Sequence, residues 1–160
     1  MFHPEAFYRV ENSSSREIYV LNQGRNSDFT GYSGAQQIFV LKDDGTTVSA
    51  VDVDTTKDKV QGIKLTIANP QIIDGTDDPT KPIVAGFCTI YDTDTSCKSG
   101  LERVDLAART STLVMDRSSA AEKGNGSVVA AKNGKFFAAV AISDGSTGYK
   151  LSLIHISEPT

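Results

Sequence analysis

Short runs of β-branched and aromatic residues, bounded by turn-forming residues, constrain the fold of this chain more than any other feature. Five runs predict β-strands, and they cover residues 17–21, 37–41, 63–67, 82–91 and 136–142. Asn133-Gly134 favours the positive φ angles of a tight hairpin turn, and Asp43-Asp44-Gly45 indicates another turn. Residues 118–124 have a helix cap but almost no apolar face, so we expect a loop or a single turn there. The sequence therefore predicts an all-β protein.

Two segments share one layout, which indicates that the strands form repeated units. Residues 37–48 and residues 100–114 each contain an apolar strand, an aspartate-containing turn and a threonine-rich return strand, and each follows another predicted strand. A third unit begins at Ser127 and runs through the Asn133-Gly134 hairpin to Ile142. Self-similarity on this scale is typical of β-propellers and related arrays.

The repeated strands resemble blade strands of six- or seven-bladed, lactonase-like β-propellers, including the YncE-like repeat proteins. The similarity lies in IYVLNQG (18–24), GLERVDL (100–106) and KNGKFFAAV (132–140). It implies an incomplete β-propeller-like array of two to three blade-like units, with long inserted loops at residues 55–62 and 69–81. The chain has no tryptophan, so it departs from families with a Trp-Asp blade ending. Short strands in this pattern also fit a small β-sandwich, and that alternative stays open.

The last ten residues match the translation of a transposase-type sequencing-library adapter at every position. We therefore interpret residues 151–160 as a non-native tail, and residues 1–150 as a single β-rich domain fragment whose frame continued past Lys150. The alternative is a natural final strand, because Leu151 to Ile156 alternate as a strand does. A piece of a propeller leaves an apolar blade face uncovered, so we expect the chain expressed alone to associate or to be poorly soluble.

Charge and histidine content narrow the functions of this segment. A formal net charge of −4 without a Lys/Arg cluster argues against a nucleic-acid-binding surface. The longest apolar run, residues 136–142, is too short for a membrane-spanning helix, which needs about 20 residues. Only His3 and His155 are present, so the segment does not assemble a histidine-dependent triad or a histidine-rich zinc site. Whether the complete protein is an enzyme stays open.

Cys88 and Cys97 are the only cysteines and form our candidate disulfide, closing a short polar loop. Such a bond requires an oxidising compartment, which indicates an extracellular or periplasmic location. The alternative is two unrelated reduced thiols, with Cys88 as a small core residue on a strand.

Two acidic stretches begin like calcium-binding loops, one at Asp52-Val53-Asp54 and one at Asp92-Thr93-Asp94. Both lack the glycine and the glutamate that the helix-loop-helix calcium motif requires at its sixth and twelfth positions. We therefore expect solvated loop aspartates at both places, and we assign no metal or cofactor site.

Three functions fit these observations. We favour a secreted or surface β-propeller that acts as a binding or scaffolding module for a protein, glycan or small molecule. The resemblance implies an alternative, a lactonase-like hydrolase in which a divalent metal at the centre of the complete ring polarises an ester carbonyl. The third is a structural β-domain of a virion or an adhesin.

Overall fold

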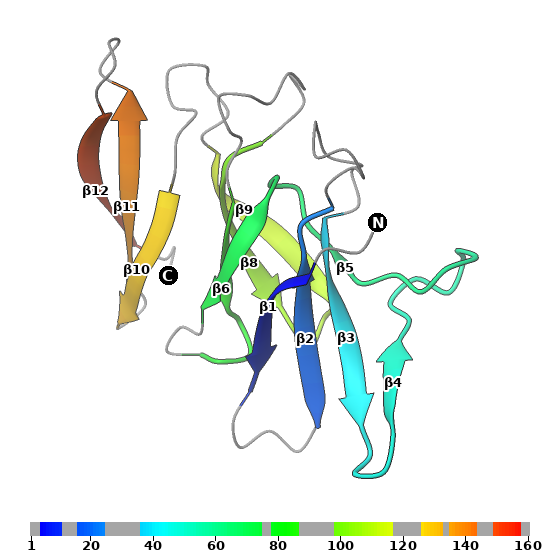
Figure 1. Cartoon of the computed structure of the whole chain (residues 1–160). Coiled ribbons are helices and arrows are strands. Elements are labelled where there is room, and N and C mark those ends of the chain that lie inside the picture. Colours follow the sequence, from blue (N-terminus) through cyan, green and yellow to red (C-terminus); the bar gives the residue numbers. More distant parts are fainter. Residues whose placement is uncertain are drawn as a thin grey trace.

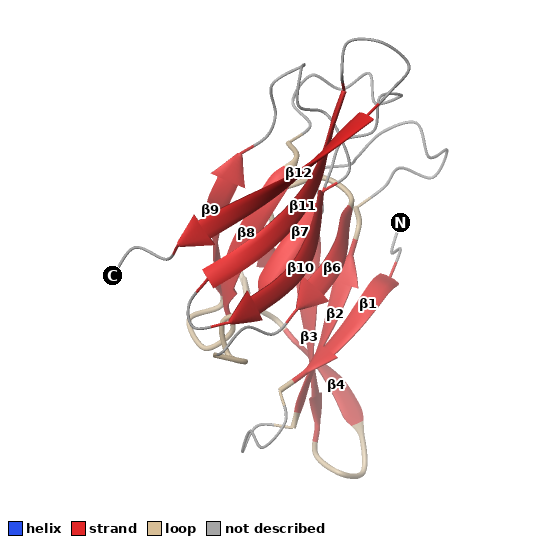
Figure 2. Cartoon of the chain, turned by 90° about the vertical axis from the view of Figure 1, so that its left-hand side faces the viewer, coloured by secondary structure: helices blue, strands red, loops and turns tan. Residues whose placement is uncertain are grey.

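The chain is built from antiparallel strands, which confirms the predicted all-β class. The computed structural model describes residues 4–10, 16–24, 36–74, 78–86, 98–116, 126–132, 135–143 and 149–157. Within these ranges the strands form three sheets, and none of the sheets closes into a barrel (Figures 1 and 2). The described residues contain no helix that is long and apolar enough to cross a membrane.

The first sheet is an up-and-down meander with one added strand. Its order is β1-β2-β3-β4, and β5 pairs with β3 beyond the end of β4. The strands are β1 (Pro4–Arg9), β2 (Glu17–Asn22), β3 (Gln37–Asp43), β4 (Val48–Val51) and β5 (Ile63–Lys64).

The second and third sheets repeat the meander. The order is β6-β7-β8-β9 in the second sheet and β10-β11-β12 in the third. The second sheet contains β6 (Pro70–Asp74), β7 (Ile83–Gly86), β8 (Gly100–Asp105) and β9 (Thr110–Asp116). The third contains β10 (Gly126–Lys132), β11 (Lys135–Ser143) and β12 (Tyr149–Ser157).

The first two sheets share one layout, in which each of four consecutive strands pairs with the next. Val20 on β2 lies opposite Phe39 on β3, and Asn22 lies opposite Gln37. The hairpins after β3 and β8 start from the Asp43–Val48 and Asp105–Thr110 pairs. Counted from these pairs, Val84 opposite Glu102 in the second sheet takes the place of Tyr19 opposite Val40 in the first. The predicted hairpins after β3 and β8 both form, with β4 and β9 as their return strands. The two sheets therefore have the same order of four antiparallel strands, and their origin as repeats of one blade-like unit stays a prediction.

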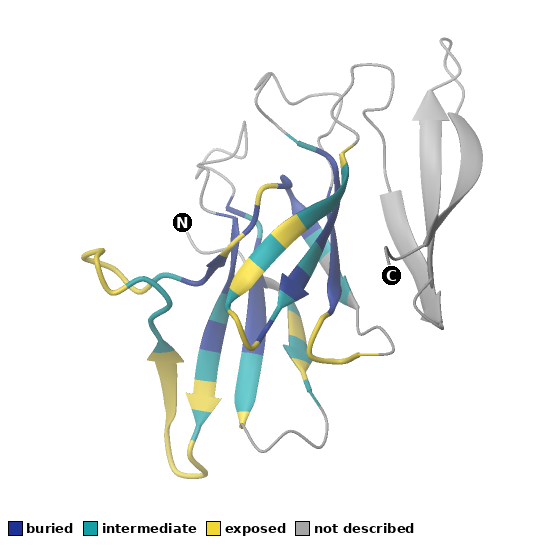
Figure 3. Ribbon diagram, turned by 180° about the vertical axis from the view of Figure 1, so that it is seen from behind, coloured by how far each residue is buried: buried dark blue, intermediate teal, exposed yellow. Residues whose placement is uncertain are grey.

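The main core lies between the first and second sheets. Its buried residues come from β2 and β3 on one side, from β7 and the β8 hairpin on the other, and from the segment that joins the two sheets. They are Tyr19, Leu21, Ile38, Val40, Ile63, Leu65, Ile67, Val84, Val104 and Leu106. Figure 3 shows this burial along β2, β3 and β8, whereas β4 is mostly exposed.

The three sheets follow one another in space in the order of the sequence. The first strand of the second sheet, β6, contacts β1 of the first sheet and β10 of the third, and β10 also contacts β7 (Figure 1). The second sheet therefore has a neighbour on each side. The residues interpreted as a non-native tail enter the third sheet, because Leu151 to Ser157 pair with β11. Their non-native origin stays a prediction.

Candidate binding site

Alternate residues of β2 and β3 lie on opposite faces of the first sheet, and apolar residues occupy both faces. Leu21 and Ile38 pair with each other and are buried in the core between the sheets. Val20 and Phe39 form the next pair along, so they lie on the other face, away from the second sheet. Apolar residues on both faces are typical of a sheet that is covered on both sides.

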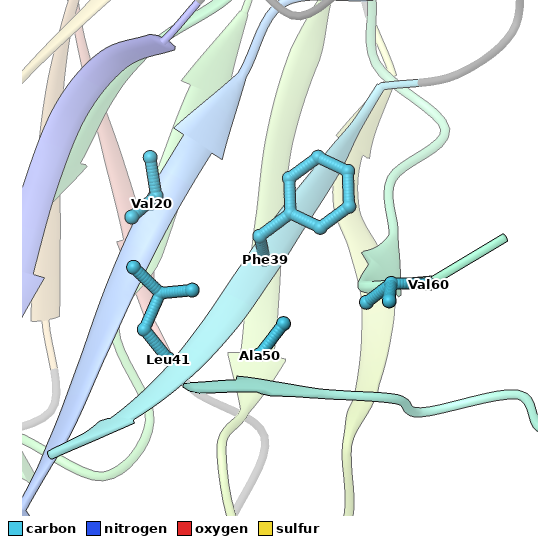
Figure 4. Close-up of a pocket in the computed structure, with 5 residues that line it drawn as sticks. All are labelled: Val20, Phe39, Leu41, Ala50 and Val60. Carbon is cyan, nitrogen blue, oxygen red and sulfur yellow. The ribbon is translucent and has the colours of Figure 1, made fainter. Parts of the chain in front are cut away.

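An open apolar hollow lies on this second face (Figure 4). Its volume is about 250 Å³, which accommodates one or two side chains rather than a large ligand. Strands β2, β3 and β4 supply most of its lining, and one residue comes from the loop before β5. The lining residues are Val20, Phe39, Leu41, Ala50 and Val60.

The large apolar side chains that are exposed in the described part of the chain gather around this hollow. Phe7 is 71% exposed, Val48 is 58% exposed and Val60 is 44% exposed. Phe7 lies opposite Val20 in the β1–β2 pair. Val48 is two residues from Ala50 on β4, so it lies on the same face of the sheet. We call this surface the outer apolar face, and it consists of Phe7, Val20, Phe39, Leu41, Val48, Ala50 and Val60.

The loop that carries Val60 is fastened at both ends. The Asp52 carboxyl group accepts hydrogen bonds from the backbone N–H groups of Asp54 (3.2 Å) and Gln61 (2.9 Å), and these bonds close the loop. The backbone N–H of Gly62 donates to Oε1 of Gln37 at 2.7 Å, which ties the loop to β3. Local hydrogen bonds therefore hold Val60 at the rim of the hollow.

Gly62 is needed where the loop approaches β3. A β-carbon there would clash with the carbonyl oxygen of Ile38 and would lie 2.7 Å from the Ile38 carbonyl carbon and 2.9 Å from the Phe39 nitrogen. These neighbours are backbone atoms of a paired strand, so they have little freedom to move away.

The aspartates of the first acidic stretch act as turn caps. Besides the role of Asp52 in closing the loop, Asp54 accepts hydrogen bonds from the side chain and the backbone N–H of Thr56. These bonds hold the pKa of Asp54 below its usual value. Asp44 accepts bonds from the backbone of Thr46 and Thr47, with the same effect on its pKa. Their oxygens thus bind the N–H groups of their own turns.

A polar cluster links the first sheet to the β8–β9 turn. Arg109 donates a hydrogen bond from Nη2 to Oε1 of Glu17 at 2.7 Å, and the Tyr19 hydroxyl donates to Oε2 of Glu17 at 2.7 Å. The Arg109 guanidinium also lies 5.9 Å from the centre of the Tyr19 ring. Burial and the hydrogen bond to Glu17 raise the pKa of Tyr19 to about 12. The members of the cluster bind one another, and the Glu17–Arg109 pair joins the first sheet to the β8–β9 turn of the second.

Glu102 is fully buried and takes the place of backbone pairing in the segment between the sheets. Its Oε1 accepts hydrogen bonds from the backbone N–H groups of Thr66 (2.6 Å) and Ile67 (3.1 Å). Its Oε2 has no hydrogen-bond partner among the described residues. Glu102 therefore anchors the connection that brings the second sheet against the first.

The structure describes only some of the residues that the sequence singled out. Cys88, Cys97, Asp92 and Asp94 lie outside the described residues, so the disulfide stays a prediction. Within the described ranges, His, Cys, Asp and Glu side chains form no group of three or more that could hold a metal ion. The outer apolar face was not predicted as a site, although its signal is visible in the uninterrupted apolar run from Ile38 to Leu41.

Comparison with known proteins adds no relative to this description: neither a protein-family model, nor a curated protein, nor a solved structure matches the chain.

Proposed function

We propose that the chain is a binding or scaffolding module of a secreted or surface protein, and that it binds a protein partner through the outer apolar face. One observation carries the proposal: Phe7, Val48 and Val60 expose large apolar side chains around a single apolar hollow. Contiguous exposed apolar surface on a folded protein is typical of an interaction site.

The energetics of this face suit an apolar side chain as the contacting group. Complete burial of a Phe or Val side chain contributes roughly 1.5–3 kcal/mol, and covering the parts of Phe7 and Val60 that are still exposed contributes a share of this to binding. The hollow beside Phe39 gives an inserted side chain a defined pocket, which is the usual setting of an interface hot spot.

The arrangement of the sheets supports the propeller-like array as the setting of this module. Successive antiparallel meanders are the units from which propeller blades are built. The first strands of the three sheets are also neighbours, because β6 contacts both β1 and β10. A two-layer sandwich has no place for a third sheet beyond the second, so the stack favours the array over the sandwich.

A selection from a phage-displayed peptide library on the dilute folded chain tests the proposal. We expect enriched peptides with aromatic or aliphatic anchors whose binding weakens at least tenfold on a Phe7→Asp/Val60→Asp double variant. An Ala107→Asp variant, changed at an exposed position in the β8–β9 turn, serves as the matched control and should bind normally. Peptides that bind all three proteins equally, or no enrichment at all, would contradict the proposal.

A further inference from the structure

Strand β4 ends the first sheet, and among the described residues its second side has no partner strand. The sheet order stops at β4, which pairs with β3 alone. Figures 1 and 3 show β4 at the margin of the first sheet, where Val48, Ser49 and Ala50 are exposed. β5 pairs with β3 beyond the end of β4, so it does not cover this side. We call the unpaired side of Val48–Val51 the β4 edge.

The hydrogen-bond pattern shows which backbone groups lie on the β4 edge. The backbone N–H of Asp43 donates to the carbonyl oxygen of Arg16 at 2.8 Å, so the backbone groups of Asp43 point to β2. Successive residues of an antiparallel strand point these groups to opposite sides. Val48 lies opposite Asp43, so the backbone groups of Val48, and of Ala50 two residues later, point away from β3. Each of these two residues presents an N–H donor and a C=O acceptor at the edge.

The same two residues place their side chains on the outer apolar face. Val48 is exposed there, and Ala50 lines the hollow beside Leu41, which lies opposite it on β3. A strand added at the β4 edge would bring alternate side chains next to Val48 and Ala50 on this face. One extended segment would thus make both the backbone pairing and the apolar contact.

The β4 edge lacks the residues that usually keep a strand edge from pairing. Natural edges carry charged residues, proline or a β-bulge, which block or distort an added strand. Residues 48–51 read Val-Ser-Ala-Val, without a charge or a proline, and their register with β3 contains no bulge. The next residue, Asp52, uses its carboxyl group to bind N–H groups of its own loop. The edge is therefore open to another strand.

We propose that the partner contributes an extended segment that pairs with β4 as an added strand, with apolar side chains at alternate positions over the outer apolar face. This inference rests on the proposed function, because it says which kind of segment the face binds. The backbone groups of Val48 and Ala50 specify a strand, since a helix has no free N–H or C=O groups along its length to meet them. Backbone pairing then gives affinity, and the face selects the side chains.

The Ala50→Pro variant tests the pairing on the protein side. Proline removes the N–H group that points away from β3, and it leaves the β3–β4 hydrogen bonds in place. Ala50→Val is the matched comparison, because it adds a side chain of similar size and keeps the N–H. We expect the selected library peptides to bind Ala50→Pro at least tenfold more weakly than Ala50→Val. Equal binding by the two variants, with cooperative thermal unfolding of both, would overturn the added strand.

An N-methyl scan of a selected peptide tests the pairing on the unchanged chain, so its result does not depend on the folding of a variant. We expect at least a tenfold loss of binding at every second position, where the peptide N–H meets the β4 edge, and little change at the positions between. Sensitivity at no position, or a repeat of three to four residues as in a helix, would overturn the inference.

The Phe7→Asp/Val60→Asp variant separates this inference from the proposed function. If the peptides need Phe7 and Val60 but bind both Ala50 variants equally, the added strand is ruled out while the proposed function stands. Peptides that distinguish the Ala50 variants but not the double variant would contradict the proposed function and leave pairing at the β4 edge intact. Dimers of the unchanged chain in sedimentation velocity that Ala50→Pro abolishes would place a second copy at the edge and overturn a separate partner.

Discussion

Glu17 lies on β2 of the first sheet and Arg109 in the turn between β8 and β9 of the second, and their carboxylate oxygen and guanidinium nitrogen lie 2.7 Å apart. The pair is mostly shielded from solvent, since the Glu17 side chain is 12% exposed. Replacing one partner leaves the other without its charge complement. We therefore expect Arg109→Met, which keeps the aliphatic stem, to lower the free energy of unfolding by about 1–3 kcal/mol in urea titrations. An unchanged midpoint of urea unfolding would show that the Glu17–Arg109 pair does not stabilise the contact between the sheets.

Acid should weaken the Glu17–Arg109 pair. Burial alone would raise the pKa of Glu17, but hydrogen bonds from Arg109 and Tyr19 and the charge of Arg109 hold it below 4.5. Because the folded-state pKa is the lower one, the stabilisation is present above 4.5 and is lost as the pH falls through the folded value. The difference in unfolding free energy between the unchanged chain and Arg109→Met should therefore shrink below pH 4.5. A constant difference down to the lowest pH would contradict this.

Alkali should act through Tyr19. Its pKa is about 12 against an ordinary value of 10.0, because burial and the bond to Glu17 disfavour the tyrosinate. A raised folded-state pKa means that the stabilisation is complete below pH 10 and is lost as the pH rises toward 12. We expect the unfolding free energy to fall over this interval and the Tyr19→Phe variant to show a shallower fall. Equal slopes for the two proteins would argue against this role of Tyr19.

Replacing Glu102 should destabilise the connection between the first two sheets. In Glu102→Ala the N–H groups of Thr66 and Ile67 lose their acceptor inside the protein, which costs about 2–4 kcal/mol. Glu102→Gln keeps one side-chain oxygen for these donors, so it should lose less stability than the alanine variant. Thermal unfolding of both variants measures the difference, and the reverse order would show that the carboxyl group does not anchor this segment.

Gly62→Ala should disturb the hollow without changing any residue that lines it. The added methyl group would meet the backbone of Ile38 and Phe39, so the loop carrying Val60 must shift. We expect a loss of about 1–3 kcal/mol in stability and weaker binding of the selected peptides. Asp58→Ala, at an exposed position in the same loop, should leave both quantities unchanged. Normal peptide binding by Gly62→Ala would show that binding does not depend on the position of Val60.

The sequence was a good guide to strands whose hydrogen bonds form with their neighbours. The runs at residues 17–21 and 37–41 became β2 and β3, and residues 136–142 lie within β11. Asn133-Gly134 predicted the β10–β11 hairpin, which does form, although the turn itself lies outside the described residues. In these places the apolar pattern and the turn residues act over short distances, so local sequence was sufficient.

The prediction for residues 63–67 was only partly right, and Glu102 explains why. Ile63, Leu65 and Ile67 are buried and alternate with exposed residues, as in a strand, but only Ile63–Lys64 pairs as β5. The N–H groups of Thr66 and Ile67 bind a side chain instead of a neighbouring strand. Local periodicity reports which residues are buried, whereas it contains no information about a carboxyl group more than thirty residues away.

The candidate site was missed for a different reason. The apolar run from Ile38 to Leu41 predicted a strand, but only the arrangement of the sheets shows that Ile38 and Val40 are buried in the core whereas Phe39 and Leu41 stay partly exposed. The exposure of Phe7, Val48 and Val60 likewise depends on how β1, β4 and the loop before β5 are placed. The propeller resemblance, the secreted location and the disulfide stay predictions.

Binding of an environment-sensitive naphthalenesulfonate dye tests most directly whether the first sheet carries an uncovered apolar face. The measurement is made on dilute protein, with cooperative thermal unfolding confirmed in the same samples. We predict dye fluorescence for the unchanged chain and for Ala107→Asp, and a several-fold loss for Phe7→Asp/Val60→Asp. Equal fluorescence from the unchanged chain and the double variant, or none from either, would contradict the outer apolar face as the binding surface.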